Sequence, residues 1–325
     1  MKILLTHTPQ MRDNYYGARA LAGLRSLGEV KLHQGSATLD TPALIVAARD
    51  CDLIVADRTT ALPAQVFAAL PQLKAALRVA VDIRNIDVAA ASSHGVLVSR
   101  ARPGFVASVT ELVLGLLVDL NRGISSATAA YHAGQVPAAR MGRQLSGTTI
   151  GIIGYGAIGR AVAPLASAMG MQVLIADPHV AVAEPGFCRV DLNTLLENSD
   201  HVVCLAVATE ETENLIDAAA FARMRRDAVF INVSRGNLVD EAALAAALTE
   251  QRIAGAALDV GRAPDQMPTP ALAAMPNVIA TPHIGGLTPP AIEAQALHTV
   301  EQVRALLAGA VPDGAVNATD WRRRI

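Results

Sequence analysis

The sequence is poor in cysteine. Its 325 residues include 3 cysteines, Cys51, Cys188 and Cys204. They are odd in number and far apart, so they predict neither a disulfide framework nor a clustered metal site. We therefore expect a reducing, cytoplasmic compartment and no metal cofactor.

The sequence also has no large excess of either charge and no long apolar run. The 27 basic and 29 acidic residues leave a formal net charge of −2, which gives no electrostatic basis for binding nucleic acid. The short run Arg322–Arg324 is interpreted as a solvated end. The apolar run at the N-terminus is too short for a signal peptide, and none approaches the roughly 20 residues of a membrane-spanning helix. We expect neither a nucleic acid nor a membrane partner.

Apolar residues make up 52% of the chain, and their arrangement predicts an α/β protein. Short β-branched runs alternate with longer alanine- and leucine-rich segments at helical spacing, which is typical of parallel sheets covered on both faces. The expected strands are residues 2–6, 29–33, 51–57, 76–81, 95–99, 149–154, 172–177, 201–207, 228–234, 255–260 and 277–283.

These strands fall into two blocks. The second block opens with a long helix expected over residues 107–126. One more helix, over 289–309, follows the last strand, and a lone helix cannot bury its own apolar face. We expect this helix to pack on the first block. The predicted domains are therefore residues 1–99 with 287–325, and residues 100–286.

A glycine-rich loop lies between a predicted strand and a predicted helix. Gly154, Gly156 and Gly159 form G-x-G-x-x-G, which would supply a tight turn, close approach to a pyrophosphate and close helix packing. The N-terminus of the helix would attract the phosphates. Asp177 ends the next strand, where an acid accepts bonds from ribose hydroxyls and repels a 2′-phosphate, so NAD is favoured over NADP. The alternative is that Asp177 only caps the turn at Pro178.

Three polar residues lie at the carboxyl ends of later predicted strands. Taken singly, each residue has a structural alternative. Arg235 would form a structural ion pair, Asp259 would cap a turn, and His283 would be a hydrogen-bonded polar residue at a domain edge. Together, beside a dinucleotide loop, they predict a reaction centre. An arginine fork suits a carboxylate and an adjacent carbonyl, a histidine moves the proton that accompanies hydride transfer, and an acid can hold the nicotinamide carboxamide.

Four segments carry a family resemblance: GIIGYGAIGR, INVSRGNLVDEAALAAAL, IAGAALDV and NVIATPHIGG. Together they resemble the D-isomer-specific 2-hydroxyacid dehydrogenases, which include phosphoglycerate, glycerate and formate dehydrogenases. The likeness runs from about Leu73 to Gly286. It implies two Rossmann-like domains with parallel sheets and a cleft between them. It also implies a small 2-hydroxy or 2-oxo acid substrate and a homodimer joined through the cofactor domain.

The resemblance also implies residue roles. Arg235 would bind the substrate carboxylate and carbonyl, His283 would be the general acid/base, and Asp259 would contact the nicotinamide carboxamide. The cofactor site would also include Ala157, Ile158, Val233, Ser234 and Gly286.

One departure from the family concerns the partner of the catalytic histidine. In the family a phenylalanine follows the strand that bears the aspartate, and a glutamate a few residues later bonds the histidine. Here Gly261 and Pro264 occupy those places, and Asp265 follows. Two interpretations stay open: a small loop shift lets Asp265 partner His283, or Asp265 is an exposed residue of a Pro-Asp turn.

A second departure lies in the outer domain. The family has a glycine-rich loop that holds the substrate carboxylate, whereas this chain has Ala80 and Asp82 at glycine positions. The candidate substrate-binding residues are Val81, Asp82 and Arg84. Asp82 would be neutralised by Arg78 or Arg84. Arg84 would alternatively contact a second acidic group of the substrate or form a scaffold pair with Asp82.

Two functions from different classes follow. The first is an NAD-dependent oxidoreductase acting on a small 2-hydroxy acid. The second is an NAD(H)-responsive sensor like the C-terminal-binding-protein corepressors, which share the family. Arg235 and His283 favour the enzyme. The 3% aromatic content offers little for a large aromatic substrate to stack on.

Overall fold

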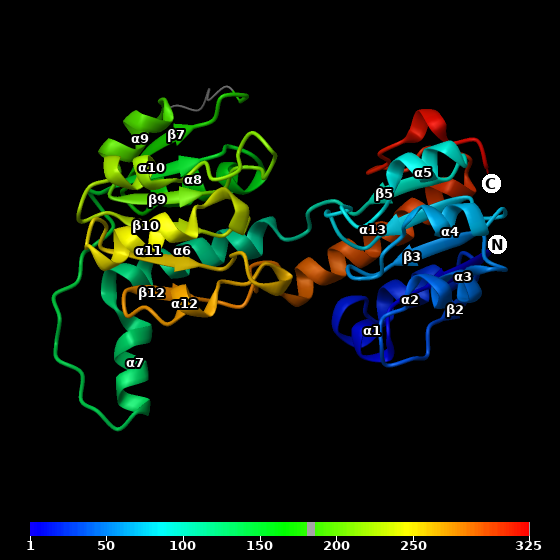
Figure 1. Cartoon of the computed structure of the whole chain (residues 1–325), viewed down its shortest axis with the longest axis horizontal. Coiled ribbons are helices and arrows are strands. Elements are labelled where there is room, and N and C mark those ends of the chain that lie inside the picture. The colour runs from blue at the N-terminus through cyan, green and yellow to red at the C-terminus, as the bar shows by residue number, and fades with distance from the viewer. Residues whose placement is uncertain (181–185, 325) are drawn as a thin grey trace. The chain divides into compact units, whose positions relative to one another are not determined.

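The computed structural model describes residues 1–180 and 186–324, and it has the α/β architecture that the sequence predicts (Figure 1). The chain divides into two compact units. Unit 1 comprises Met1–Phe105 and Pro289–Ile325, and unit 2 comprises Val106–Thr288. Each unit contains one sheet in which every strand pairing is parallel.

Unit 1 runs to Phe105 instead of the expected residue 99, and unit 2 ends at Thr288 instead of residue 286. The Arg100 N–H donates to the Gly314 carbonyl at 3.0 Å. The Arg102 N–H donates to Nδ1 of His298, also at 3.0 Å. These bonds tie the segment before residue 106 to unit 1.

Unit 1 has a five-stranded sheet in the order β2-β1-β3-β4-β5. Its strands are β1 (Lys2–Leu5), β2 (Glu29–Leu32), β3 (Leu53–Ala56), β4 (Ala75–Arg78) and β5 (Leu97–Arg100). Its helices are α1 (Pro9–Tyr15), α2 (Ala18–Arg25), α3 (Thr41–Ala48), α4 (Ala64–Ala69), α5 (Val88–Ser93), α13 (Pro289–Leu307) and the 3₁₀ turn Ala318–Asp320.

Two apolar cores cover the two faces of this sheet. Along β1, Ile3 and Leu5 belong to one core and Leu4 to the other, as the alternation of side chains in a strand requires. The first core includes Val300 and Val303 of α13. The C-terminal helix therefore buries its apolar face on the first block, as the sequence predicts.

Unit 2 has a seven-stranded sheet in the order β12-β11-β10-β9-β6-β7-β8. Its strands are β6 (Thr149–Ile153), β7 (Gln172–Ala176), β8 (Phe187–Arg189), β9 (His201–Cys204), β10 (Val229–Asn232), β11 (Gly255–Leu258) and β12 (Val278–Ala280). Its helices are α6 (Val106–Arg122), α7 (Ile124–His132), α8 (Ala157–Ala168), α9 (Leu192–Asn198), α10 (Ala218–Arg223), α11 (Glu241–Thr249), α12 (Pro270–Ala273) and the 3₁₀ turns Gly236–Leu238 and Pro264–Gln266.

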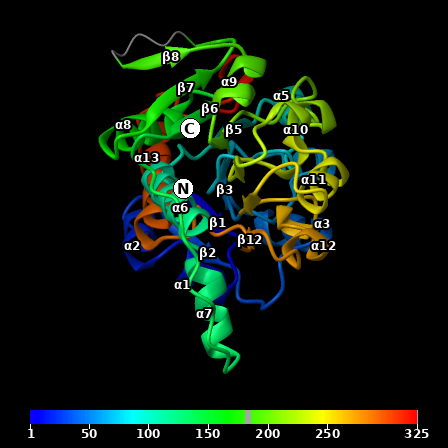
Figure 2. The same cartoon turned by 90° about the vertical axis from the view of Figure 1, so that its left-hand side faces the viewer.

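Two features of unit 2 differ from the prediction. The single helix expected over 107–126 is divided into α6 and α7 at Gly123, whose φ of +66° is left-handed and ends a helix. The short strand β8, not predicted, adds to the sheet outside β7 (Figure 2). No helix in the described part of the chain is long and apolar enough to cross a membrane.

Candidate active site

The glycine loop joins β6 to α8. Gly154 has a φ of +93°, and a Cβ there would lie 2.7 Å from the Cα of Ala206. A Cβ on Gly159 would lie 2.5 Å from the Gly154 carbonyl oxygen. At Gly156, by contrast, a Cβ would meet nothing within 4 Å. The loop is therefore packed tightly on its protein side and open at Gly156, which fits a pyrophosphate.

Helix α8 begins directly at this opening. Gly156 is its N-cap, and Ala157 and Ile158 are its first residues. The first N–H groups of a helix have no acceptor within it and carry the positive end of the helix dipole. The N–H groups of Ala157 and Ile158, to which the resemblance assigns the pyrophosphate, therefore lie at this opening.

The carboxylate of Asp177 connects the end of β7 to the glycine loop. One oxygen accepts the N–H of Tyr155 at 2.7 Å. The other accepts those of His179 and Val180 at 2.8 and 3.0 Å. Burial alone would raise the pKa of Asp177, but these three bonds outweigh it and lower the pKa. Asp177 therefore caps the turn and stays charged, and a carboxylate has about four acceptor sites, so a ribose hydroxyl can still be accommodated.

Arg235 follows β10 and is held by its neighbours. The side-chain amide of Asn232 donates to the Arg235 carbonyl at 2.9 Å and accepts the Ser234 N–H at 3.1 Å. The Ser234 hydroxyl donates to the Ala206 carbonyl at 2.6 Å, and Val233 between them is buried. The half-buried Arg235 donates through Nη1 to the Ser234 carbonyl at 2.7 Å. Sequence reasoning missed Asn232, although its place at the end of the strand was a usable signal.

Two glycines bring the segment after β11 against the main chain that follows Arg235. A Cβ on Gly236 would lie 2.1 Å from the Gly261 carbonyl oxygen. A Cβ on Gly261 would lie 2.6 Å from the Cα of Pro268. The missing side chain of Gly236 allows the contact between the two segments, and that of Gly261, where the family has phenylalanine, allows Gly261 to pack against Met267 and Pro268.

Asp259 is buried and anchors the loop that carries His283. Its Oδ1 accepts the Thr281 hydroxyl at 2.6 Å and the Ile284 N–H at 2.8 Å. Its Oδ2 accepts the Gly285 N–H at 2.9 Å. The resemblance implies that this carboxylate contacts the nicotinamide. In the structure it bonds residues on either side of His283 in the chain. Thr281 was missed by sequence reasoning. Gly286, assigned to the cofactor by resemblance, follows this loop and is half-buried.

His283 is oriented by a main-chain carbonyl. Its Nδ1 lies 3.0 Å from the carbonyl oxygen of Asp265. A carbonyl can only accept, so Nδ1 carries a proton and Nε2 is left for other chemistry. His283, Asp265 and Gln266 all have left-handed φ values, of 55°, 56° and 59°. The turn is closed by the Gly261 N–H, which donates to the Gln266 carbonyl at 2.8 Å. Asp265 thus meets His283 through its backbone.

The candidate substrate residues of unit 1 lie after β4. Arg84 contacts Asp82 through Nη2 at 2.6 Å and through Nε at 3.0 Å, and this hydrogen bonding raises the pKa of Arg84. Arg78 is fully buried instead, and its Nη2 donates to the Thr60 carbonyl at 3.0 Å. The structure therefore contains an Asp82–Arg84 ion pair, which neutralises Asp82. Val81, beside it, is half-buried.

A buried carboxylate that sequence reasoning missed lies at the same edge of unit 1. Asp57 follows β3 and accepts the hydroxyls of Thr6, Thr59 and Thr60. Burial alone would raise the pKa of Asp57, but these bonds hold it well below the usual range. Arg78 donates to the Asp57 carbonyl. The only sequence signal was an acid at a strand end followed by two threonines.

The sheet order brings the unit 2 candidates together. Arg235, Asp259 and His283 follow β10, β11 and β12, which are adjacent and parallel. Strands lie about 4.8 Å apart, so β10 and β12 are separated by about 10 Å, within reach of the two side chains. The glycine loop follows β6 at the same edge. Among residues 1–180 and 186–324, no group of three or more His, Cys, Asp or Glu has an arrangement that could hold a metal ion.

Comparison with known proteins agrees with this geometry. Residues 114–285 match the family described as D-isomer specific 2-hydroxyacid dehydrogenase, NAD binding domain. The chain is similar to D-3-phosphoglycerate dehydrogenase of Methanocaldococcus jannaschii, with 34% identity over 92% of the chain and 57% of that enzyme. It is also similar to (S)-sulfolactate dehydrogenase of Chromohalobacter salexigens, with 38% identity over 78% of the chain and 84% of that enzyme. The chain spans little more than half the length of the phosphoglycerate dehydrogenases that it matches.

A similarity to a solved structure extends over both units. A D-lactate dehydrogenase of Lactobacillus jensenii, determined with NAD⁺, is similar with a TM-score of 0.82 and 29% identity. That alignment covers 97% of this chain and 99% of the other.

Proposed function

The chain belongs to the D-isomer specific 2-hydroxyacid dehydrogenase family, and we propose that it interconverts a small D-2-hydroxy acid and its 2-oxo acid with NAD. The observation that carries the proposal is the placement of Arg235 and His283 after two parallel strands of one sheet. The glycine loop, with its opening at Gly156, follows a third strand of that sheet. NAD would be held by this loop, by the N-terminus of α8 and by Asp177, and when bound it supplies or takes up the hydride.

Arg235 is proposed to bind the substrate carboxylate and to polarise the neighbouring 2-oxo group. A guanidinium presents parallel N–H donors that match this pair of oxygens. Asn232 fixes the main chain on both sides of Ser234, so the guanidinium starts from a rigid strand end.

His283 is proposed to move the proton. In reduction it donates a proton from Nε2 to the oxygen that becomes the hydroxyl, and in oxidation Nε2 takes that proton back. The bond from Nδ1 to the Asp265 carbonyl keeps the ring in one orientation throughout. The three bonds to Asp259 fix the position of the loop that carries His283.

The substrate is proposed to be short. The relatives' names describe 2-hydroxy acids of three carbons, D-3-phosphoglycerate and (S)-sulfolactate, both with a second anionic group. The chain's few aromatic residues, 3% of the total, offer little stacking surface for a large substituent.

The direct test is NADH oxidation with a panel of 2-oxo acids. The panel contains glyoxylate, pyruvate, hydroxypyruvate, 3-phosphohydroxypyruvate, sulfopyruvate, 2-oxoglutarate and phenylpyruvate. We expect turnover on at least one short acid and a kcat/KM at least tenfold lower on phenylpyruvate. An enzyme that binds NADH but turns over none of these acids would contradict the proposal.

We also propose that the protein is a homodimer joined through unit 2. Helix α7 extends away from the sheet of that unit (Figure 1). It and the segment after it expose large apolar side chains: Tyr131 is 62% exposed, Val136 86% and Met141 97%. We propose that these side chains contact a second copy of the chain, since symmetric dimers are the commonest assembly of soluble proteins.

A further inference from the structure

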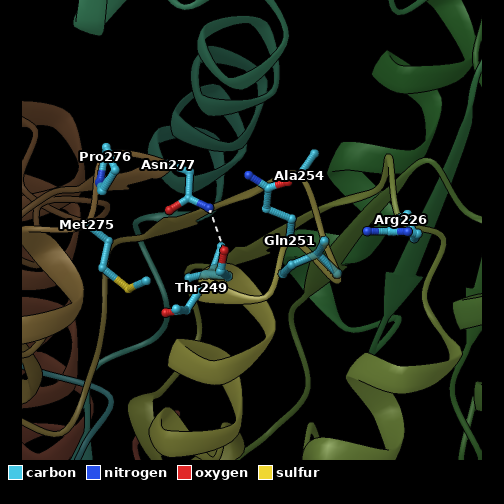
Figure 3. A pocket seen from close by; sticks show the side chains of 9 residues that line it. Arg226, Thr249, Gln251, Ala254, Met275, Pro276 and Asn277 are labelled. Atoms are coloured by element: carbon cyan, nitrogen blue, oxygen red, sulfur yellow. Dashed lines mark hydrogen bonds between the residues drawn. The ribbon is translucent and has the colours of Figure 1, made fainter.

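A hollow lies at the edge of the unit 2 sheet where the strands begin. It has a volume of about 680 Å³, within the range of about 300–1,000 Å³ that small-molecule sites occupy. Its lining comes from the segments that precede β10, β11 and β12 and from the end of α11 (Figure 3). The candidate active site follows the same strands, so the hollow is separated from it by the length of the strands.

The walls of this hollow are fixed by hydrogen bonds. The side-chain amide of Asn277 donates to the Leu248 carbonyl at 3.2 Å. The Ala254 N–H donates to the Ala228 carbonyl at 2.8 Å. Gln251 has a left-handed φ of +53°, which turns the chain sharply between α11 and β11. The hollow is therefore preformed, which lowers the entropic cost of binding a ligand.

The lining is apolar at one end and cationic at the other. Figure 3 shows Met275 and Pro276 at one end, Arg226 at the opposite end and Gln251 between them. The nine lining residues include no carboxylate. The ligand that this arrangement fits is elongated, with an apolar body and an anionic head.

Arg226 differs from the neighbouring arginines. Arg223 bonds Glu197 at 2.7 Å, and Arg225 bonds Asp227 at 3.1 Å. Arg226 makes no hydrogen bond or ion pair with any residue in the described ranges, and its guanidinium keeps all five N–H donors for a ligand.

We propose that this hollow binds a small amphipathic anion, with its carboxylate, sulfonate or phosphate on Arg226 and its apolar body against Met275 and Pro276. The thioether and proline ring supply the apolar contact, and the Gln251 amide supplies a polar contact midway. The proposal does not depend on the substrate or on the catalytic roles given above, because none of those residues lines the hollow.

The test uses the aromatic sulfonate 8-anilinonaphthalene-1-sulfonate, titrated by calorimetry into the full chain saturated with NAD⁺. Saturation keeps the probe out of the cofactor site. We expect one site per chain and a Kd raised about tenfold by Arg226→Gln, because a charge-assisted bond is lost. Arg223→Gln is the matched control, since it removes an arginine of the same segment outside the hollow, and it should leave the Kd within about twofold.

A second variant tests the apolar part without changing charge. Ala254 lines the hollow and is exposed, so Ala254→Phe should fill it and abolish binding while the folded state persists. The proposal is overturned if the probe does not bind beside NAD⁺. It is equally overturned if Arg226→Gln and Arg223→Gln bind alike, or if Ala254→Phe binds as the wild type does.

Discussion

At the scale of single residues, the orientation of His283 depends on a backbone that few residue types adopt. Asp265 and Gln266 are consecutive residues with left-handed φ, which is costly for side chains other than glycine, asparagine and aspartate. Such strain persists where the surrounding structure enforces it, and it concentrates at functional sites. Here the enforced feature is a carbonyl directed at Nδ1 of His283.

Because the Asp265 carbonyl contacts His283, the role of the Asp265 main chain can be tested separately from that of its carboxylate. Asp265→Asn keeps the left-handed preference and the carbonyl, so we expect kcat within about threefold of the wild type and the same pH–rate profile. Asp265→Val disfavours the left-handed conformation, turns the carbonyl away and should lower kcat about tenfold or more. Steady-state kinetics of both variants is the measurement. A large loss in Asp265→Asn alone would show that the carboxylate is the partner.

Sequence reasoning singled out Asp265 but did not identify its carbonyl as the group that contacts His283. A proline and an aspartate after β11 predicted either a turn or an acid partner for the histidine, and the structure combines the turn with a main-chain partner. The residue types alone do not predict which atom of Asp265 contacts His283, because the direction of its carbonyl depends on the backbone angles of Asp265 and Gln266. Asn232 and Thr281 were missed for a related reason: Asn232 bonds the neighbouring main chain and Thr281 bonds the Asp259 carboxylate, and many polar side chains can make such bonds.

At the scale of elements, two constraints can require glycine in the loop between β6 and α8: a left-handed φ and a lack of space for a Cβ. Gly154 is needed by the fold, since its φ is +93° and a Cβ would touch the main chain at Ala206. Gly156 is free of both constraints, with a φ of −76° and no atom within 4 Å of a Cβ.

We expect an alanine at Gly156 to weaken NADH binding and an alanine at Gly154 to destabilise the fold. Gly156→Ala should change the free energy of unfolding by less than about 0.5 kcal/mol and raise the Kd for NADH about tenfold, because the methyl group occupies space needed by the pyrophosphate. Gly154→Ala should destabilise the fold by about 3 kcal/mol or more. Chemical denaturation and fluorescence titration with NADH check both. Unchanged NADH affinity in Gly156→Ala would remove this loop from the cofactor site.

The strands were predictable because buried parallel strands are continuous apolar runs between polar ends. The division of the long helix at Gly123 was not, since a glycine within a helical pattern is often tolerated and only the left-handed φ shows that it ends α6. Strand β8 was missed because it is an edge strand of 3 residues, Phe187–Arg189, with little apolar pattern.

At the scale of the whole molecule, each unit contains a histidine that is buried in the neutral form. Burial is the main cause that lowers the pKa of His7 in unit 1, and of His201 in unit 2, to about 4. The unfolded chain binds these protons near pH 6.5, whereas the folded chain does so near pH 4. The stabilising contribution is therefore complete above about pH 6.5 and is lost as the pH falls towards about 4.

We accordingly expect the free energy of unfolding to fall between pH 6.5 and 4, by up to about 3 kcal/mol for each histidine. Urea denaturation at several pH values is the measurement. His201→Gln should flatten the dependence for unit 2. The buried carboxylate of Asp57 does not contribute in this window, because its pKa lies well below 3.8. A stability that is constant from pH 7 to 4.5 would contradict this account.

The exposed apolar side chains of α7 and the following segment predict the assembly state. Light scattering should give twice the chain mass of 33.8 kDa. Met141→Asp, at a side chain that is 97% exposed, should weaken the dimer because it places a charge in an apolar interface. Val46→Asp is the control, since Val46 is 66% exposed but belongs to unit 1. A wild-type monomer would rule out the proposed interface.

The central claim is that Arg235 and His283 act on a substrate beside NAD bound at the glycine loop. The most direct measurement is the kcat of His283→Gln with saturating NADH and the best 2-oxo acid of the panel. We predict a fall of about 10²–10⁴-fold, because proton transfer is lost, with the Kd for NADH within about twofold of the wild type. A variant that retains the wild-type kcat would contradict the account.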